Sequence, residues 1–124
     1  MQILRVENSQ GTGMYKAWGS AGRSMNYNQG KWPHAENDSA LMADLRLKHS
    51  SMKYWSSDNK FGFKTIDQLK AWIYDQKVRI SLDSENQQIS TYEIDPNHAL
   101  IGDSQCIFDN NHATLLSRTS LLSI

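Results

Sequence analysis

The acidic pair Glu93 and Asp95 is the spacing in this chain that most resembles a place for chemistry. The two residues lie two positions apart at the end of a β-rich run, Ile89 to Ile94. In an extended strand this spacing puts both side chains on one face, where loops gather ligands. Solvated charges at a strand end are the default interpretation of such a pair, and a role in chemistry is the alternative that the sequence leaves open.

Other chemistries have weaker patterns. No two histidines are four residues apart and none lies beside a cysteine pair, so we predict no metal site and expect the histidines to be structural or surface residues. Gly11-Thr12-Gly13 lacks the glycine-lysine continuation of a phosphate-binding loop. Cys106 sits in an apolar run and is predicted to be a buried, inert thiol. The four histidines are His34, His49, His98 and His112.

Aromatic and cationic residues interleave in two polar segments, Gly19 to His34 and Ser50 to Lys60. Stacking platforms beside cations are typical of proteins that bind single-stranded nucleic acid. However, Lys plus Arg and Asp plus Glu are both 13, and this zero net charge disfavours nucleic acid as the partner. The same aromatics suit a protein-binding hot spot. The candidates for partner binding are Tyr27, Trp32, Tyr54 and Trp55.

Length and composition indicate one domain over residues 1–124. The first residues lack the apolar core of a signal peptide, and no run of about 18 apolar residues is present to cross a membrane. A single cysteine cannot form an internal disulfide, which fits a reducing compartment. We therefore expect a cytoplasmic protein without a membrane partner.

The segment Phe61 to Asp75 has the clearest pattern of a strand followed by a helix in this chain. The other segments are placed relative to it. Thr65 and Gln68 have the spacing of a capping box, which predicts the start of a helix after a short strand. Gly62, between two aromatics, allows another backbone to approach closely. The apolar face of the helix is expected to contain Ile66, Leu69, Trp72 and Ile73.

The remaining patterns predict a first strand over Ile3 to Glu7 and a helix over Ser39 to His49, capped by Asn37 or Asp38. The pattern does not decide whether the last two apolar segments, Ala113 to Leu116 and Leu121 to Ile124, are helices or strands. We expect an α+β fold, a single compact domain with a mixed sheet of short strands and two helices. Further strands are predicted over Val78 to Leu82, Ile89 to Ile94, Ala99 to Ile101 and Gln105 to Phe108.

Short motifs along most of the chain resemble a set of small phage and prophage proteins. The layout is in turn similar to compact ADP-ribosyltransferase-like domains, which have an Arg or His on the first strand, an aromatic-Gly-aromatic strand entering a helix, and an acidic or amide residue on a late strand. The motifs are Leu4-Arg5-Val6-Glu7, Gly13-Met14-Tyr15, Trp32-Pro33-His34, Phe61-Gly62-Phe63 with Leu69 and Trp72, Ser90-Thr91-Tyr92-Glu93-Ile94, and Gly102 with Gln105 and Phe108.

The resemblance implies a role for each matching residue. It places Arg5 near the ribose or a phosphate of NAD, with Phe61 and Phe63 flanking the nicotinamide and Tyr15 on the same cofactor side. Gln105 stands where the family has its catalytic Glu. The chain departs from the family here, because a neutral amide cannot act as a base and because Lys64-Thr65 replaces the Ser-Thr-Ser element. Glu93 is the alternative acid.

Three functional hypotheses follow. The first is an NAD-dependent ADP-ribosyltransferase acting in the host cytosol on a host or defence target. The second is a non-enzymatic, anti-CRISPR-like inhibitor that binds a host protein through the loop aromatics. In the third, Arg5 is structural and pairs with Glu93 or another carboxylate, while Tyr92 packs in the core.

Overall fold

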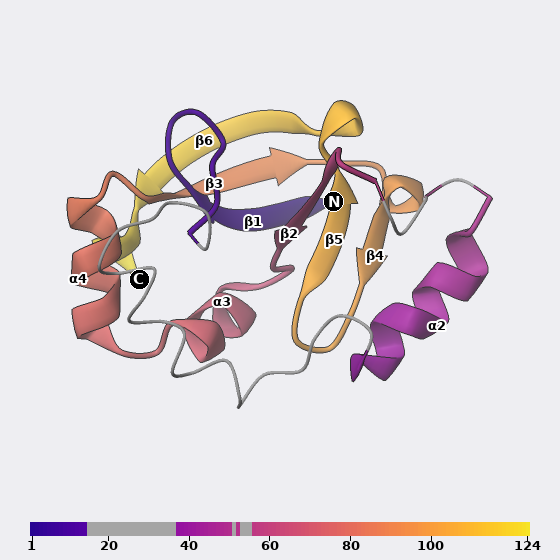
Figure 1. The fold of residues 1–124 in the computed structure, drawn as a ribbon, viewed down its shortest axis with the longest axis horizontal. Helices are drawn as coiled ribbons and strands as arrows, with labels where there is room; N and C mark the ends of the chain where they lie inside the picture. Colours follow the sequence, from indigo (N-terminus) through magenta and orange to yellow (C-terminus); the bar gives the residue numbers. More distant parts are fainter. Residues whose placement is uncertain (15–36, 51, 53–55) are drawn as a thin grey trace.

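The structure is a computed structural model and describes residues 1–14, 37–50, 52 and 56–124. Within these residues it has three α-helices and two small antiparallel sheets, so the predicted α+β class is confirmed (Figure 1). Several predicted site residues lie outside the described residues. They are Tyr15, Tyr27, Trp32, Tyr54 and Trp55.

The first sheet, sheet A, has the strand order β1-β3-β6. Strands β1 (Gln2–Glu7) and β3 (Gln88–Glu93) confirm two predicted strands, and they pair with Arg5 opposite Ser90. Strand β6 (Thr114–Ser120) pairs with β3 on the other side, with Ser90 opposite Arg118. Its local pattern had not indicated a strand, because six of its seven residues are exposed and it lacks an alternating apolar face.

The second sheet, sheet B, has the order β2-β5-β4. Its strands are β2 (Asn59–Gly62), β5 (Cys106–Asp109) and β4 (Ala99–Ile101), which confirms all three predicted strand positions. Short 3-10 turns frame its open end. They are η3 (Pro96–His98), which leads into β4, and η4 (Asn110–His112), which follows β5. A third turn, η5 (Leu121–Ser123), ends the chain.

One backbone contact joins the two sheets. Leu4 and Phe63 exchange two hydrogen bonds, from Leu4 N to Phe63 O and from Phe63 N to Leu4 O, both 2.7 Å long. Gly62 makes this approach feasible. A Cβ at that position would lie 2.7 Å from both the Leu4 carbonyl oxygen and the Ile3 Cγ2 atom. The predicted close approach at Gly62 is therefore confirmed.

Helix α3 (Ile66–Trp72) begins where the sequence predicts it. The Thr65 hydroxyl accepts a hydrogen bond from Gln68 N at 3.1 Å, as an N-cap does. The Gln68 amide oxygen, however, accepts from Lys64 N at 2.8 Å and not from the capping residue itself. Leu69 and Ile73 are buried as expected, whereas Ile66 is 39% exposed and does not belong to the core face.

Helix α4 (Gln76–Ser84) corrects the predicted strand over Val78 to Leu82. The Asp75 carboxylate accepts from Lys77 N at 2.9 Å and starts the helix. Val78 and Leu82, four residues apart, are both buried on one helical face, while Ile80 is half exposed. An alternation of only five residues fits either structure, and the capping aspartate decides for the helix.

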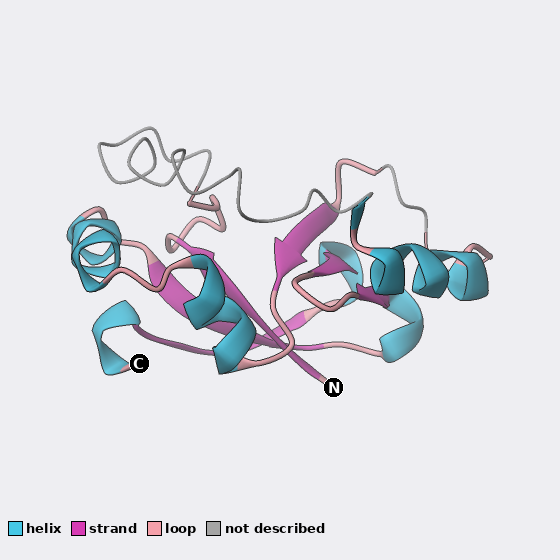
Figure 2. Ribbon diagram, turned by 90° about the horizontal axis from the view of Figure 1, so that it is seen from below, coloured by secondary structure: helices cyan, strands magenta, loops and turns pink. Residues whose placement is uncertain are grey.

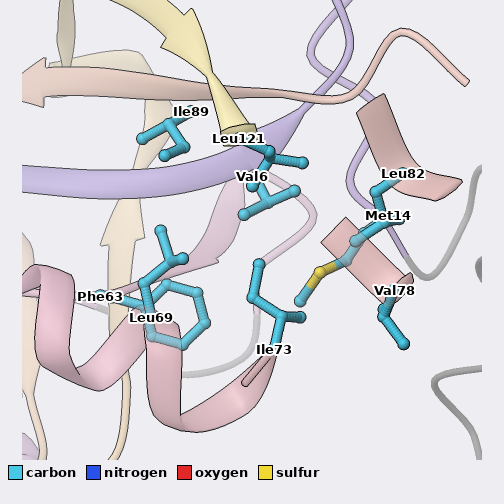
Figure 3. Close-up of a cluster of buried hydrophobic side chains, with 9 residues drawn as sticks. All are labelled: Val6, Met14, Phe63, Leu69, Ile73, Val78, Leu82, Ile89 and Leu121. Atoms are coloured by element: carbon cyan, nitrogen blue, oxygen red, sulfur yellow. The ribbon is translucent and has the colours of Figure 1, made fainter. Parts of the chain in front are cut away.

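The main hydrophobic cluster lies between sheet A and the helices α3 and α4 (Figure 3). A second cluster, which includes Ile3, Tyr92 and Phe108, packs sheet A against sheet B. A third and smaller one contains Leu41, Met52, Leu100 and Ile107 and holds helix α2 (Ser39–Lys48) on sheet B. Helix α2 lies at the opposite end of the molecule from α4 (Figures 1 and 2).

A buried aspartate fixes helix α2. Asp38 caps the helix by accepting from Leu41 N at 3.2 Å, and it also accepts from Asp103 N at 3.1 Å and Ser104 N at 3.0 Å in the β4–β5 turn. Burial raises the pKa of the Asp38 carboxyl, but these hydrogen bonds outweigh it and hold the pKa below its usual value. Within α2 an ion pair spans one turn, since Lys48 Nζ lies 2.7 Å from Asp44 Oδ2.

The sheet junction predicts a large effect at Gly62. We expect Gly62→Ala to lower the free energy of unfolding by about 2 kcal/mol, because one of the atoms in its way is a backbone carbonyl that cannot move aside cheaply. Urea denaturation measures this change. Lys60→Ala in the same strand adds no atom near β1 and should change the free energy by less than about 0.5 kcal/mol. Equal effects of the two substitutions would contradict the close approach.

Candidate functional site

Glu7 is the most deeply buried charged side chain among the described residues, with 1% of its surface exposed. Side chains alternate along β1, and Val6 packs into the cluster beneath sheet A. Glu7 and Arg5 therefore point to the opposite face of the sheet. Burying a carboxylate costs free energy unless cations and hydrogen-bond donors surround it.

Three side chains surround the Glu7 carboxylate. Arg5 Nε donates to Glu7 Oε1 at 2.7 Å, and the Tyr92 hydroxyl donates to Glu7 Oε2. Arg118 Nη2 lies 3.7 Å from the same Oε2, while its Nε donates to Ser90 Oγ at 3.2 Å. The strand register explains this meeting, since Arg5, Ser90 and Arg118 occupy one row across the three strands of sheet A.

The rest of the Arg5 guanidinium is also engaged. Its Nη1 donates to Phe61 O at 2.8 Å, and its Nη2 contacts Gly11 O at 3.4 Å. Gly13 lies so close that a Cβ there would come within 2.6 Å of Nη2. Arg5 thus ties β1 to β2 and to the turn that follows β1, and only 11% of its side chain is exposed.

This polar cluster is a structural network of fixed charge. Desolvation, followed by the hydrogen bond and negative charge of Glu7, raises the pKa of Tyr92 to about 12, so its hydroxyl stays protonated at neutral pH. Glu7 is held by two guanidinium groups and a hydroxyl and is closed off from solvent. Both oxygens of this carboxylate are thus engaged by side chains of the protein itself.

The two predicted nicotinamide walls differ in their exposure to solvent. The Phe61 side chain is 55% exposed, whereas Phe63 is 5% exposed and packs into the main cluster with its ring 5.9 Å from that of Trp72. Arg5 points to the face opposite this cluster. The structure therefore brings Arg5 to the backbone of Phe61 but not to the Phe63 ring.

The two predicted catalytic residues are also separated along the sheets. Glu93 pairs with Gln2 and accepts a hydrogen bond from the Met1 amino group at 2.9 Å. It lies three strand positions from the partner of Arg5, about 10 Å along the sheet. Gln105 is buried at the end of the β4–β5 turn, directly before Cys106, which pairs with Gly62. The described contacts do not join Glu93 to Arg5.

Sequence reasoning missed Glu7 and Arg118 as members of this cluster. Arg5 does pair with a carboxylate, but with Glu7 and not with Glu93, and Tyr92 is buried as the structural hypothesis expected. The rule that places residues two apart on one strand face had been applied to Glu93 and Asp95. Applied to Arg5 and Glu7, it would have indicated the pair.

The protein is thus a small α+β domain with two sheets. Its first-strand arginine, Arg5, binds groups of the protein itself. In the part of the chain that the structure describes, no helix has the length and apolar character to cross a membrane. The chain belongs to the bacteriophage T4 Y00F protein family, whose model matches residues 1–122. No curated protein and no solved structure matches it. The expected relation to small phage proteins is confirmed, and the transferase resemblance stays a prediction.

The buried network predicts a pH-dependent stability that involves Tyr92. Its pKa is higher in the folded protein, about 12, than the ordinary value of 10.0, so its contribution is complete below pH 10 and is lost as the pH rises toward 12. We expect Tyr92→Phe to lower the free energy of unfolding by about 1–3 kcal/mol at pH 7, because Glu7 loses its hydroxyl donor. The decline above pH 10 should also become shallower. Denaturation at a series of pH values measures both effects.

A double-mutant cycle with Glu7→Gln supplies the control. If the two side chains act together, the loss in Tyr92→Phe/Glu7→Gln should be smaller than the sum of the single losses by about 1 kcal/mol. Additive losses would contradict the network.

Proposed function

We propose that this phage protein acts without catalysis, by binding a host protein in the host cytosol through the outer edge of strand β6. The partner class includes components of host defence systems. The observation that carries the proposal is the exposure of β6.

Strand β6 is the outermost strand of sheet A on its side (Figure 1). Six of its seven residues are exposed. Its described hydrogen bonds run to β3, so the backbone groups on the outer edge are available to another strand. Strand addition is a common way in which a protein receives an extended peptide.

Strand β6 contains a bulge, which is one of the devices that protect natural edge strands. It lacks two others, because it has neither a proline nor a charge that points outward. The only charged residue of β6 is Arg118, and its guanidinium turns inward to Ser90 and Glu7. A bulge occurs where Tyr92 pairs with Leu115 and Thr91 with Ser117, so that Leu116 is the extra residue. Both leucines remain exposed, at 41% and 50%.

The character of β6 indicates its partner. Exposed leucines next to serine and threonine favour an extended, uncharged segment with apolar side chains. A second copy fits less well when the whole strand pairs. Full-length antiparallel pairing of two copies is centred on Ser117 and would set Leu115 opposite Thr119 and Leu116 opposite Arg118, without any apolar pair across the strands. A host protein with a complementary segment is the better occupant for a chain of a phage family.

ADP-ribosyl transfer has less support in the described geometry. The Arg5 guanidinium is occupied by Glu7, Phe61 O and Gly11 O, and Phe63 is in the core. Gln105 is buried and Glu93 holds the Met1 amino group. The inhibitor hypothesis based on the loop aromatics concerns residues outside the described ranges and stays a prediction.

The proposal predicts that Leu116→Glu weakens partner binding at least about tenfold, or about 1.4 kcal/mol, because a charge on β6 blocks strand addition. The partner is first captured from host lysate, identified and purified. Affinity is then measured by calorimetry. Hydrogen exchange of residues 114–120 should slow in the complex more than that of any other described strand.

Leu47→Glu is the matched control, because Leu47 is 80% exposed and lies on helix α2, away from β6. It should change the affinity by less than about twofold. Undiminished binding by Leu116→Glu, or protection confined to another segment, would refute docking at β6. Self-association of the free protein through residues 114–120, seen by sedimentation, would replace the host protein by a second copy.

A nucleotide titration separates the two functions. We expect calorimetry of the folded protein to show no saturable NAD binding beyond that of ADP, because the described arginine of the predicted pocket already contacts protein acceptors. NAD binding that saturates, exceeds ADP binding and is lost in Arg5→Lys would favour the transferase instead. Circular dichroism checks that this variant remains folded.

A further inference from the structure

His98, Asp109 and His112 meet at the open end of sheet B. Ala99 pairs with Phe108 in the β4–β5 ladder, so His98 and Asp109 flank the same rung from outside. The η4 turn then brings His112 back over this end. One nitrogen or oxygen atom from each of the three side chains lies within 4.8 Å of the other two.

The two imidazole rings are stacked in parallel. Their centroids are 3.7 Å apart and their planes differ by 3°. His112 Nε2 lies 3.7 Å from Asp109 Oδ2, which is longer than a hydrogen bond. The other carboxylate oxygen is fixed separately, since Asp109 Oδ1 accepts from Asn111 N at 3.0 Å as the cap of η4. The cap therefore orients the carboxylate and leaves Oδ2 facing a histidine.

A buried nitrogen in this group lacks a partner. His98 Nδ1 is inaccessible to solvent and makes no hydrogen bond within the described part of the chain. A buried polar atom without a partner costs free energy. The cluster thus combines an unsatisfied imidazole nitrogen, a second imidazole and an oriented carboxylate.

We infer that His98, Asp109 and His112 form a binding site for a divalent transition-metal ion, with Zn²⁺ the ion that fits best. Two imidazoles and one carboxylate are a common donor set for such ions. Mg²⁺ and Ca²⁺ prefer sites made of oxygen atoms, and this cluster offers them a single carboxylate. The site is distinct from the Glu7 network and does not depend on partner binding at β6.

The geometry needs only side-chain adjustment. Ligands about 2.1 Å from a tetrahedral metal are about 3.4 Å apart, so the three donor atoms must draw together from their present spread. The rings must also tilt, because a metal lies near the plane of each imidazole that binds it. Half of the His112 side chain is exposed, so this ring can turn and solvent can complete the coordination shell.

A bound ion would link the two turns at the open end of sheet B. It would join η3 to η4 and so close the open end of sheet B. Strand β6 begins two residues after His112, so the ion would also fix the crossing from sheet B to sheet A. Metal binding should therefore stabilise the folded protein.

The test is metal titration of the full chain. Calorimetry with Zn²⁺ should give one ion per chain, and Co²⁺ should give the visible absorption of a tetrahedral site. Saturating Zn²⁺ should raise Tm by about 5–10 °C. His112→Ala and Asp109→Asn should each weaken binding at least about tenfold. The asparagine keeps an oxygen to cap η4, so that substitution separates metal binding from folding.

His49→Ala is the matched control, since His49 is an exposed histidine at the end of α2. It should leave affinity, stoichiometry and the Co²⁺ spectrum unchanged. The site is refuted if the wild-type protein gives no saturable heat and no Co²⁺ spectrum, or if both site variants bind as tightly as wild type. Half an ion per chain, with two chains per ion in sedimentation, would overturn a site formed by one chain.

Discussion

The architecture depends on the reciprocal backbone hydrogen bonds between Leu4 and Phe63, at the point where the two sheets touch. Each sheet has only three strands, and neither could bury two faces alone. The junction fixes the position of the two sheets relative to each other. It directs Phe63 into the cluster under sheet A and places the Phe61 carbonyl where Arg5 reaches it. Gly62 is the residue that allows the two backbones to come so close.

The buried Glu7 network then determines what the arginine of the first strand can do. Two guanidinium groups and one tyrosine hydroxyl compensate a single carboxylate on the face of sheet A that α3 and α4 leave uncovered. Such networks contribute little net stability, but they penalise any arrangement that leaves a member unpaired. Here the network specifies the strand register and holds the turn after β1 through Arg5 and Gly11. An arginine so engaged is a part of the scaffold.

Elements with strong local signals could be predicted from sequence, and elements defined by distant partners could not. Thr65 and Asp38 indicate the starts of α3 and α2 in the sequence, because each cap accepts a hydrogen bond from a backbone N–H only three residues further along. Strand β6 is held in place by its pairing with β3. Because most of its residues are exposed, its sequence shows no alternation of apolar and polar residues. The alternation over Val78 to Leu82 was misleading for a different reason, since a five-residue run fits two periods and only the cap at Asp75 distinguishes them. The clusters around Glu7 and His98 each contain a pair close in sequence, Arg5 with Glu7 and Asp109 with His112. Their other members, Tyr92, Arg118 and His98, are remote in the chain, and only the fold brings them to these pairs.

Helix α2 shows how unevenly this molecule is held together. It rests on a four-residue apolar cluster, on the Asp38 carboxylate and on hydrogen bonds of Asp44 and Lys48 to β4, while the opposite end is secured by nine buried side chains. A segment with a smaller buried contact opens locally at a lower free energy than the body of the fold. We therefore expect the peptide amides of α2 to exchange with solvent before those of sheet A.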